Sequence, residues 1–258
     1  LYSSTNLRRT YNQFGRLQAV KYTNISFDEI EGQRLLDCNI QLSTNKAHSI
    51  SFEPEGTNTA GDLGAAVALT YQNRNLFKGS EVLGIQLRGA YEAIRGLEGY
   101  SNQDFIEYSV EASLSFPRLI APFISRGFSR RTNSQSEVSL MYDLQNRPEY
   151  PRRVLSLAWK YKWANVGHHD KYQLDVLDIN YLFMPWISDT FREDYLEDDT
   201  NKNAILRYNY ENLLIMKWGF SYAYNNGRYA VKAAVETSGN LLDLCSGLFN
   251  YSKNSQGQ

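Results

Sequence analysis

Long runs of alternating apolar and polar residues constrain the fold of this chain more than any other feature. From residue 47 onward this alternation replaces almost all helical periodicity. The expected strands are about nine: 47–53, 65–72, 83–92, 106–116, 137–144, 155–163, 171–183, 213–224 and 228–236. Because successive residues of a strand point to opposite faces, each segment has one apolar and one polar face. The pattern predicts a mostly β fold, an antiparallel meander.

Two architectures fit these segments. In a soluble β-sandwich or barrel the apolar face is a core, and strands are usually about five or six residues long. In a transmembrane barrel the apolar face meets lipid, and a tilted strand needs about ten residues to cross. Several segments here have that length, and Arg88, Glu111 and Lys160 lie in the middle of polar faces, which therefore meet water. The lengths and these charges favour the membrane barrel.

Composition is consistent with a barrel and excludes other classes. The 258 residues include 27 basic and 28 acidic side chains, a balance that argues against a nucleic-acid partner held by bulk electrostatics. Mean hydropathy is −0.49, and no apolar run approaches the roughly 18 residues of a transmembrane helix. The 19 Tyr, 12 Phe and 4 Trp suit strands and membrane-interface belts.

A turn, a bulge and the lengths of the connections add three local expectations. The sequence Asn225-Asn226-Gly227 is a strong hairpin signal between the last two segments. Within 171–183 the alternation slips near Val176 and Leu177, as it does at a β-bulge. The connections 93–104 and 184–203 are long whereas 73–79 is compact, which is typical of an outer-membrane barrel.

Residues 1–46 have a different character. A short helix is expected over residues 6–14, with Ser4 or Thr5 as its N-cap and Gly15 at its end. Two strand-like segments follow at 19–27 and 35–44, joined by an exposed hairpin turn. A helix leading into a hairpin indicates half of a small α+β unit.

Motifs for catalysis or metal binding are weak. The sequence His168-His169-Asp170 is more simply a solvated turn than a metal cluster, because adjacent imidazoles point apart. The acidic stretch 193–199 is more simply a solvated loop than a cation site. Cys38 and Cys245 have no metal-ligand or redox spacing. No nucleophile elbow, phosphate-binding loop or dinucleotide fingerprint occurs, so we expect no enzyme, no cofactor and no metal.

Three stretches carry a resemblance to a known family. Thr10-Tyr11-Asn12-Gln13-Phe14-Gly15-Arg16-Leu17, followed by Val20 to Phe27, resembles the closing half of a polypeptide-transport-associated (POTRA) domain. His48-Ser49-Ile50-Ser51-Phe52-Glu53-Pro54 and Asn73-Arg74-Asn75-Leu76-Phe77-Lys78-Gly79 resemble the first strands of the BamA/TamA family barrel. The resemblance is strongest to the TamA-like lipoprotein branch, TamL, and covers the whole chain.

The resemblance implies two regions. Residues 1–46 would be the C-terminal part of a POTRA domain, in the periplasm, and residues 47–258 the N-terminal half of a barrel of about sixteen strands in the bacterial outer membrane. It also implies that the chain is part of a longer protein. The family's inward-folding loop carries an Arg-Gly-aromatic motif. Arg126-Gly127-Phe128 has a similar spelling but lies too early in the barrel, and we do not assign it that role.

The implied function is insertion or translocation of proteins at the outer membrane. Its implied partners are outer-membrane lipid, unfolded β-barrel clients and a periplasm-spanning TamB-like protein. The first barrel strand is expected to be short and to end at Pro54, so it would be a weakly paired edge. We therefore expect a lateral seam, where a client strand adds to the sheet. Its residues are Ser49, Ile50, Ser51, Phe52 and Glu53. The alternative is an ordinary barrel strand in a fixed seam.

The POTRA hairpin offers a second edge at Tyr22, Asn24 and Ser26, where a client or partner strand is an alternative to simple packing. Other functions remain open at this stage. Within the barrel fold these are a two-partner secretion transporter and a passive porin or surface-antigen barrel. The most distant alternative is a soluble all-β binding domain.

Overall fold

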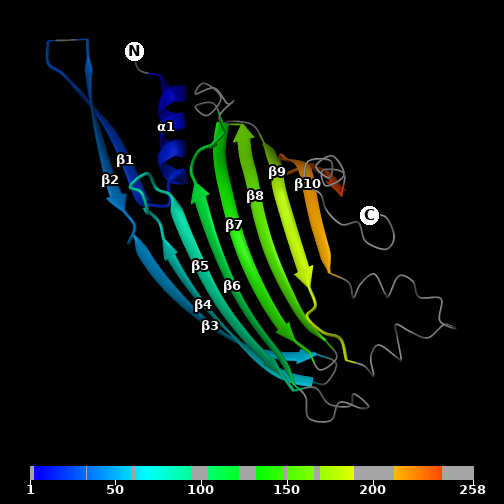
Figure 1. Ribbon diagram of the computed structural model, residues 1–258. Helices are drawn as coiled ribbons and strands as arrows, with labels where there is room; N and C mark the ends of the chain where they lie inside the picture. The colour runs from blue at the N-terminus through cyan, green and yellow to red at the C-terminus, as the bar shows by residue number, and fades with distance from the viewer. Residues whose placement is uncertain are drawn as a thin grey trace.

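The computed structural model describes residues 3–32, 34–59, 62–93, 104–121, 132–147, 150–165, 169–188 and 212–239. This part of the chain contains one helix and eleven strands. The helix and a two-stranded hairpin lie at one end of a large, curved nine-stranded sheet (Figure 1).

The helix α1 spans Ser4–Arg16 and is longer than the sequence predicted. Ser3, not Ser4 or Thr5, is the N-cap: its backbone is extended and its hydroxyl accepts a hydrogen bond from Asn6 N at 3.4 Å. Gly15 remains helical, and the helix ends because Leu17 turns extended and donates its N–H to the Phe14 carbonyl. The predicted caps were therefore wrong by one or two residues at each end.

The hairpin consists of β1 (Val20–Glu29) and β2 (Leu36–Thr44), which pair antiparallel as predicted. The side chain of Tyr11 connects it to α1. Its hydroxyl accepts a hydrogen bond from Ile25 N at 3.0 Å and lies 3.4 Å from Ile25 O. Since both partners are backbone groups of β1, the helix is fixed along the edge of the hairpin.

The nine strands of the sheet follow one another in chain order, from β3 at one edge to β11 at the other. Their bounds are β3 His48–Thr59, β4 Asp62–Asn73, β5 Val82–Glu92, β6 Phe105–Phe116, β7 Thr132–Asn146, β8 Pro151–Asn165, β9 Asp170–Phe183, β10 Leu213–Asn225 and β11 Ala230–Ser238. All nearest neighbours pair antiparallel. The predicted meander of about nine strands is confirmed for the described residues.

Two local predictions are also confirmed. The pairing register on both sides of β9 skips a residue at Val176, which is the predicted bulge. The β10–β11 turn closes with a hydrogen bond from Asn226 N to Tyr229 O, and Gly227 has φ +83°. Only glycine adopts this backbone conformation without strain.

One strand prediction was wrong. The first strand does not stop before Pro54 but continues to Thr59, with Pro54 opposite Val67. Proline is tolerated here because β3 is an edge strand: a residue that directs its backbone away from β4 loses no ladder hydrogen bond.

Burial in the sheet is the reverse of a soluble protein's. On β4 the small side chains of Ala66 and Ala68 are 3% and 5% exposed, whereas Val67 and Leu69, which point the other way, are 42% and 41% exposed. Neighbours in register continue this division across the sheet. The inner face is therefore the polar one, with small residues where strands crowd together, and the outer face is apolar.

The β4–β5 turn, residues 74–81, attaches the hairpin region to the sheet. Ser80 Oγ accepts a hydrogen bond from Ala19 N at 3.0 Å. The buried carboxylate of Glu81 holds the turn by accepting from Phe77 N at 3.3 Å and Gly79 N at 2.9 Å. Burial alone would raise the pKa of Glu81, but these N–H groups and its own outweigh it and hold the pKa below its usual value.

Replacing Glu81 by glutamine should destabilise the protein at neutral pH. A glutamine keeps only one acceptor oxygen and loses the negative charge that strengthens the bonds from the surrounding N–H groups, so we expect E81Q to lower the free energy of unfolding by about 1–3 kcal/mol. Because the folded-state pKa is depressed, the carboxylate's contribution is present above the unfolded-state pKa and is lost as pH falls through the folded-state pKa. Urea unfolding in detergent micelles should show the two proteins converging in acid.

The matched control is E31Q, because Glu31 lies exposed in the β1–β2 turn. Its unfolding should follow the parent protein's at every pH. An E81Q protein as stable as the parent at neutral pH would contradict the role given to this carboxylate.

Candidate functional site

The free edge of β3 is the first candidate site. Arg74 N donates to Ala47 O at 2.8 Å, which fixes the direction of every backbone group along the strand, because successive residues of a strand turn theirs to opposite sides. Ser49, Ser51 and Glu53 therefore direct N–H and C=O groups to β4. Ile50 and Phe52 direct theirs away from the sheet, and β3 has no other neighbour within the described residues.

The outward-directed residues of β3 also have exposed side chains. Ile50 is 72% exposed and Phe52 is 65% exposed, and both lie on the apolar outer face. We call these two residues the β3 edge. Unpaired backbone groups beside exposed apolar side chains form a template for another strand. The sequence pattern placed all five seam residues in this strand. The structure shows which of these residues bond to β4 through their backbone groups and which direct those groups away from the sheet.

A charged cluster on the inner face connects the β3 strand to the sheet. Arg88 on β5 lies 2.6 Å from Glu107 on β6 and 3.7 Å from Glu55 on β3. The three side chains thus span four adjacent strands. The Arg88–Glu107 pair is the stronger contact, since the Glu107 side chain is 19% exposed and the Glu55 side chain 53%.

Ion pairs and hydrogen bonds continue over the inner face. Lys162 lies 2.7 Å from Glu137, and Lys217 lies 3.0 Å from Glu236, which joins β10 to the other edge strand, β11. Ser156 donates to Asn180 at 2.6 Å. A face with this many charges needs contact with water.

Aromatic side chains gather on the outer face near the strand ends. At the end next to α1, Trp163 stacks on Tyr172 with ring centroids 5.4 Å apart, and Tyr172 contacts Tyr222 at 5.2 Å. Toward the other end Tyr181 stacks on Phe183. Trp163 and Leu155, which pairs with Tyr181, are about 27 Å apart along β8 at 3.4 Å per residue. An apolar band between aromatic groups of this spacing matches the height of a transmembrane barrel's outer band.

The hairpin edge has a different geometry from the one predicted. Ile30 N donates to Leu35 O, so the alternate residues Tyr22, Asn24 and Ser26 direct their backbone groups to β2. The outward-directed residue Ile25 is already bonded to Tyr11. Strand addition at this hairpin stays a prediction, and its free backbone groups are not those of the three named residues.

The other sequence candidates are not brought together as a site. His169 contacts the Tyr224 ring edge-on, and Asp170 accepts a hydrogen bond from Tyr222 at 2.8 Å. Among the described residues no group of three or more His, Cys, Asp or Glu side chains could hold a metal ion. Cys38 is exposed on β2. His168, Cys245, 126–128 and 193–199 lie outside the described residues. In the described part no helix has the length and apolar character to cross a bilayer.

Comparison with known proteins identifies a structure with a similar fold. A scan of family models and a search of curated proteins gave no match. The crystal structure of BamA from Haemophilus ducreyi lacking POTRA domains 1-3 matches with a TM-score of 0.52 and 14% sequence identity. The fold is that of a BamA-like barrel. The match covers 92% of this chain and 42% of the BamA chain, so this chain spans less than half the length of that protein. The BamA-like sheet is open between β3 and β11 in the described residues.

Two parts of the site were missed in the sequence. Arg88 was read only as a mid-strand charge, because its partners lie on strands whose register the sequence does not give. Glu55 lay beyond the predicted end of the first strand and was assigned to no face, although its alternation with Glu53 continues the polar face of β3. That pattern was the one available signal that β3 has cationic partners.

Replacing Arg88 by glutamine should loosen β3 in particular. The change leaves Glu107 and Glu55 without their cation, and a partly exposed pair of this kind contributes about 1 kcal/mol. We expect amide hydrogen exchange in 48–59 to rise about fivefold in R88Q, measured by mass spectrometry in detergent micelles.

The control is K217Q, which breaks the corresponding pair at the opposite edge. It should increase exchange in 230–238 and leave 48–59 unchanged. Equal exchange of 48–59 in R88Q and in the parent protein would show that the cluster does not hold the edge strand.

Proposed function

We propose that this protein assembles or translocates other proteins at the bacterial outer membrane and that client strands add to the β3 edge. The observation that carries the proposal is the edge itself. On a BamA-like sheet, Ile50 and Phe52 present exposed apolar side chains and backbone groups that have no partner strand among the described residues. Strand addition needs no covalent step, so the proposed role is not enzymatic and needs no cofactor or metal.

The proposed location follows from the two faces. An apolar outer face about as tall as the hydrocarbon layer, bordered by aromatic side chains, is stable in lipid and costly in water. Outer-membrane lipid is therefore the proposed surrounding of 47–258. The proposed location of 1–46 is the periplasm, as the closing part of a POTRA domain.

The proposed partners follow from the edge and the resemblance. An unfolded β-barrel client offers strands whose alternate residues are apolar, which matches the outward side chains of the β3 edge. The sequence resemblance alone supports a periplasm-spanning TamB-like partner. It alone also supports the relation to the TamL-like branch. Bulk charge supports no nucleic-acid partner.

The test is to remove edge donors without disturbing the β3–β4 ladder. In I50P the missing N–H is one that points away from β4, as in the native Pro54. We expect the rate at which the protein folds a denatured barrel client in proteoliposomes to fall about tenfold, since about one backbone hydrogen bond and a large apolar contact are lost. The readout is the client's heat-modifiable mobility on gels.

The matched control is A234P on β11. By the register with β10, Ala234 also directs its backbone away from the sheet, but at the other edge. A234P should fold clients at the parent rate. If I50P does so as well, with its thermal unfolding unchanged, the β3 edge is not the site of strand addition.

Depletion in cells separates the alternative functions. A general assembly role predicts that the levels of several other outer-membrane barrels fall. Loss of a single exported protein would identify a two-partner secretion transporter. Unchanged levels together with steady ion conductance in planar bilayers would identify a passive porin.

A further inference from the structure

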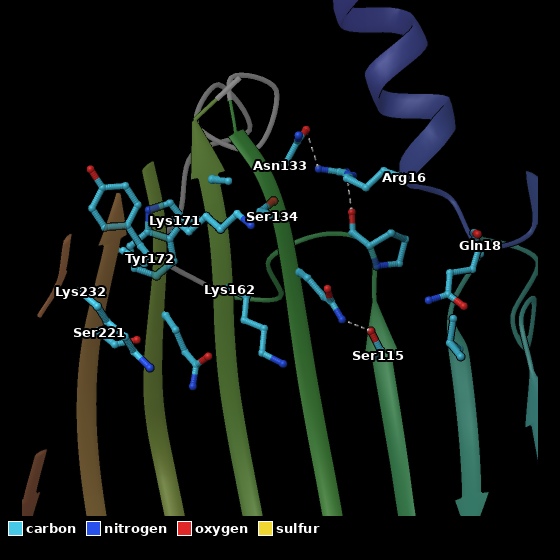
Figure 2. Close-up of a pocket in the computed structure, with 18 residues that line it drawn as sticks. Arg16, Gln18, Ser115, Asn133, Ser134, Lys162, Lys171, Tyr172, Ser221 and Lys232 are labelled. Carbon is cyan, nitrogen blue, oxygen red and sulfur yellow. Dashed lines mark hydrogen bonds between the residues drawn. The ribbon is translucent and has the colours of Figure 1, made fainter. Parts of the chain in front are cut away.

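A cavity of about 490 Å³ lies on the inner face at the end of the sheet next to α1. It is within the size range of small-molecule sites. Four of its lining residues are cations, Arg16, Lys162, Lys171 and Lys232 (Figure 2). No residue that lines it in the described part of the chain carries a carboxylate. The cavity therefore has a strongly positive lining in a protein with a net charge of −1.

Strand register explains why the cations gather here. Along the row of inward-facing residues closest to α1, Lys171 lies between Ala164 and Ala223, and Lys232 lies on the far side of Ala223. The small alanines leave space for two long lysine side chains that are two strands, or about 10 Å, apart. The next row contains Gln135, Lys162, Gln173 and Ser221.

Carboxylates appear only one row deeper. That row contains Glu137, Asp175 and Glu236. Glu137 pairs with Lys162 at 2.7 Å and so neutralises part of the cavity's charge. Neither Lys171 nor Lys232 has an ion-pair partner among the described residues. These two lysines supply the uncompensated charge.

Arg16 closes the cavity from the end of α1. Its Nη2 donates to Pro117 O at 2.8 Å, and its Nη1 lies 3.4 Å from Thr132 O and 3.5 Å from Asn133 Oδ1. These contacts leave Arg16 Nε buried without a hydrogen-bond partner among the described residues. Arg16 thus forms a cationic end wall of the cavity, and its guanidinium hydrogen bonds go to neutral oxygens.

We propose that this cavity binds a phosphate-bearing anion. A phosphate group near neutral pH carries about two negative charges and three acceptor oxygens, and it matches two uncompensated lysines beside an arginine. Neutral donors in the lining, from Gln135, Gln173 and Ser221, suit the remaining oxygens. The phosphate comes either from free phosphate or from a lipid headgroup. This site is distinct from the β3 edge and does not depend on the assembly role.

The test is calorimetric titration of the protein, purified in nonionic detergent, with sodium pyrophosphate and with inorganic phosphate. We expect saturable binding at one site. In K171Q/K232Q the affinity should fall at least about tenfold, because two charge-assisted hydrogen bonds are lost. K171R/K232R keeps both charges and should bind. K46Q/K160Q removes the same charge from positions outside the cavity and should bind like the parent.

A competition arm identifies the source of the phosphate. Displacement of pyrophosphate by dioctanoyl phosphatidic acid assigns a lipid headgroup, and displacement by inorganic phosphate alone assigns a free anion. The proposal is overturned if no saturable binding occurs, if K171Q/K232Q binds as tightly as K46Q/K160Q, or if oligoglutamate displaces pyrophosphate equally well. Thermal unfolding of each variant shows whether it is folded. K171R/K232R keeps both charges, so its binding separates loss of the charges from loss of the fold.

Discussion

Backbone N–H and C=O groups of a single-layered sheet with an apolar outer face find partners only in neighbouring strands. A soluble sheet of this kind would bury the face against a second layer, and its edges would bond to water. Here Ile50, Val67, Leu87 and Leu140 remain between about 40% and 72% exposed on the outside. In the part of the chain that the structure describes, each of the seven strands from β4 to β10 has a partner strand on both sides, and β3 and β11 each have one. The two edges are where the fold is least complete.

The polar inner face compensates for this at both edges by the same means. Arg88 connects β3 to the sheet through Glu55 and Glu107, and Lys217 connects β11 through Glu236. Ion pairs that bridge adjacent strands add to ladders that are bonded on one side only. Because these pairs are partly exposed, each adds little free energy, and an edge held this way can loosen without unfolding of the sheet. The same face changes character toward α1, where Lys171 and Lys232 have no acidic neighbours in their row among the residues described.

The sequence predicted what depends on alternation and local turn chemistry, and missed what depends on register. Nine strands, the bulge at Val176 and the turn at Gly227 all follow from patterns within a few residues. Pro54 was misread as the end of a strand, because its tolerance depends on β3 being an edge. The five residues given for the seam all lie in β3, and strand addition there stays a prediction. The division between Ser49 or Ser51 and Ile50 or Phe52 required one interstrand hydrogen bond. Arg16 and Lys232 are far apart in the chain, and no local pattern relates them to one cavity.

The number of strands has a consequence for closure of the described sheet. In an antiparallel meander of nine strands, the first and the last run in the same direction. If β3 and β11 paired with each other, they would have to do so in parallel. The backbone groups that point away from the sheet also belong to residues of different faces at the two edges. On β3 they belong to outer-face residues such as Ile50, and on β11 to inner-face residues such as Lys232. Antiparallel closure therefore requires an odd number of further strands between the two edges. In any strand that paired with β3, the residues opposite Ile50 and Phe52 would lie on the apolar face, so the strand addition proposed above requires a strand with the alternation of a membrane barrel.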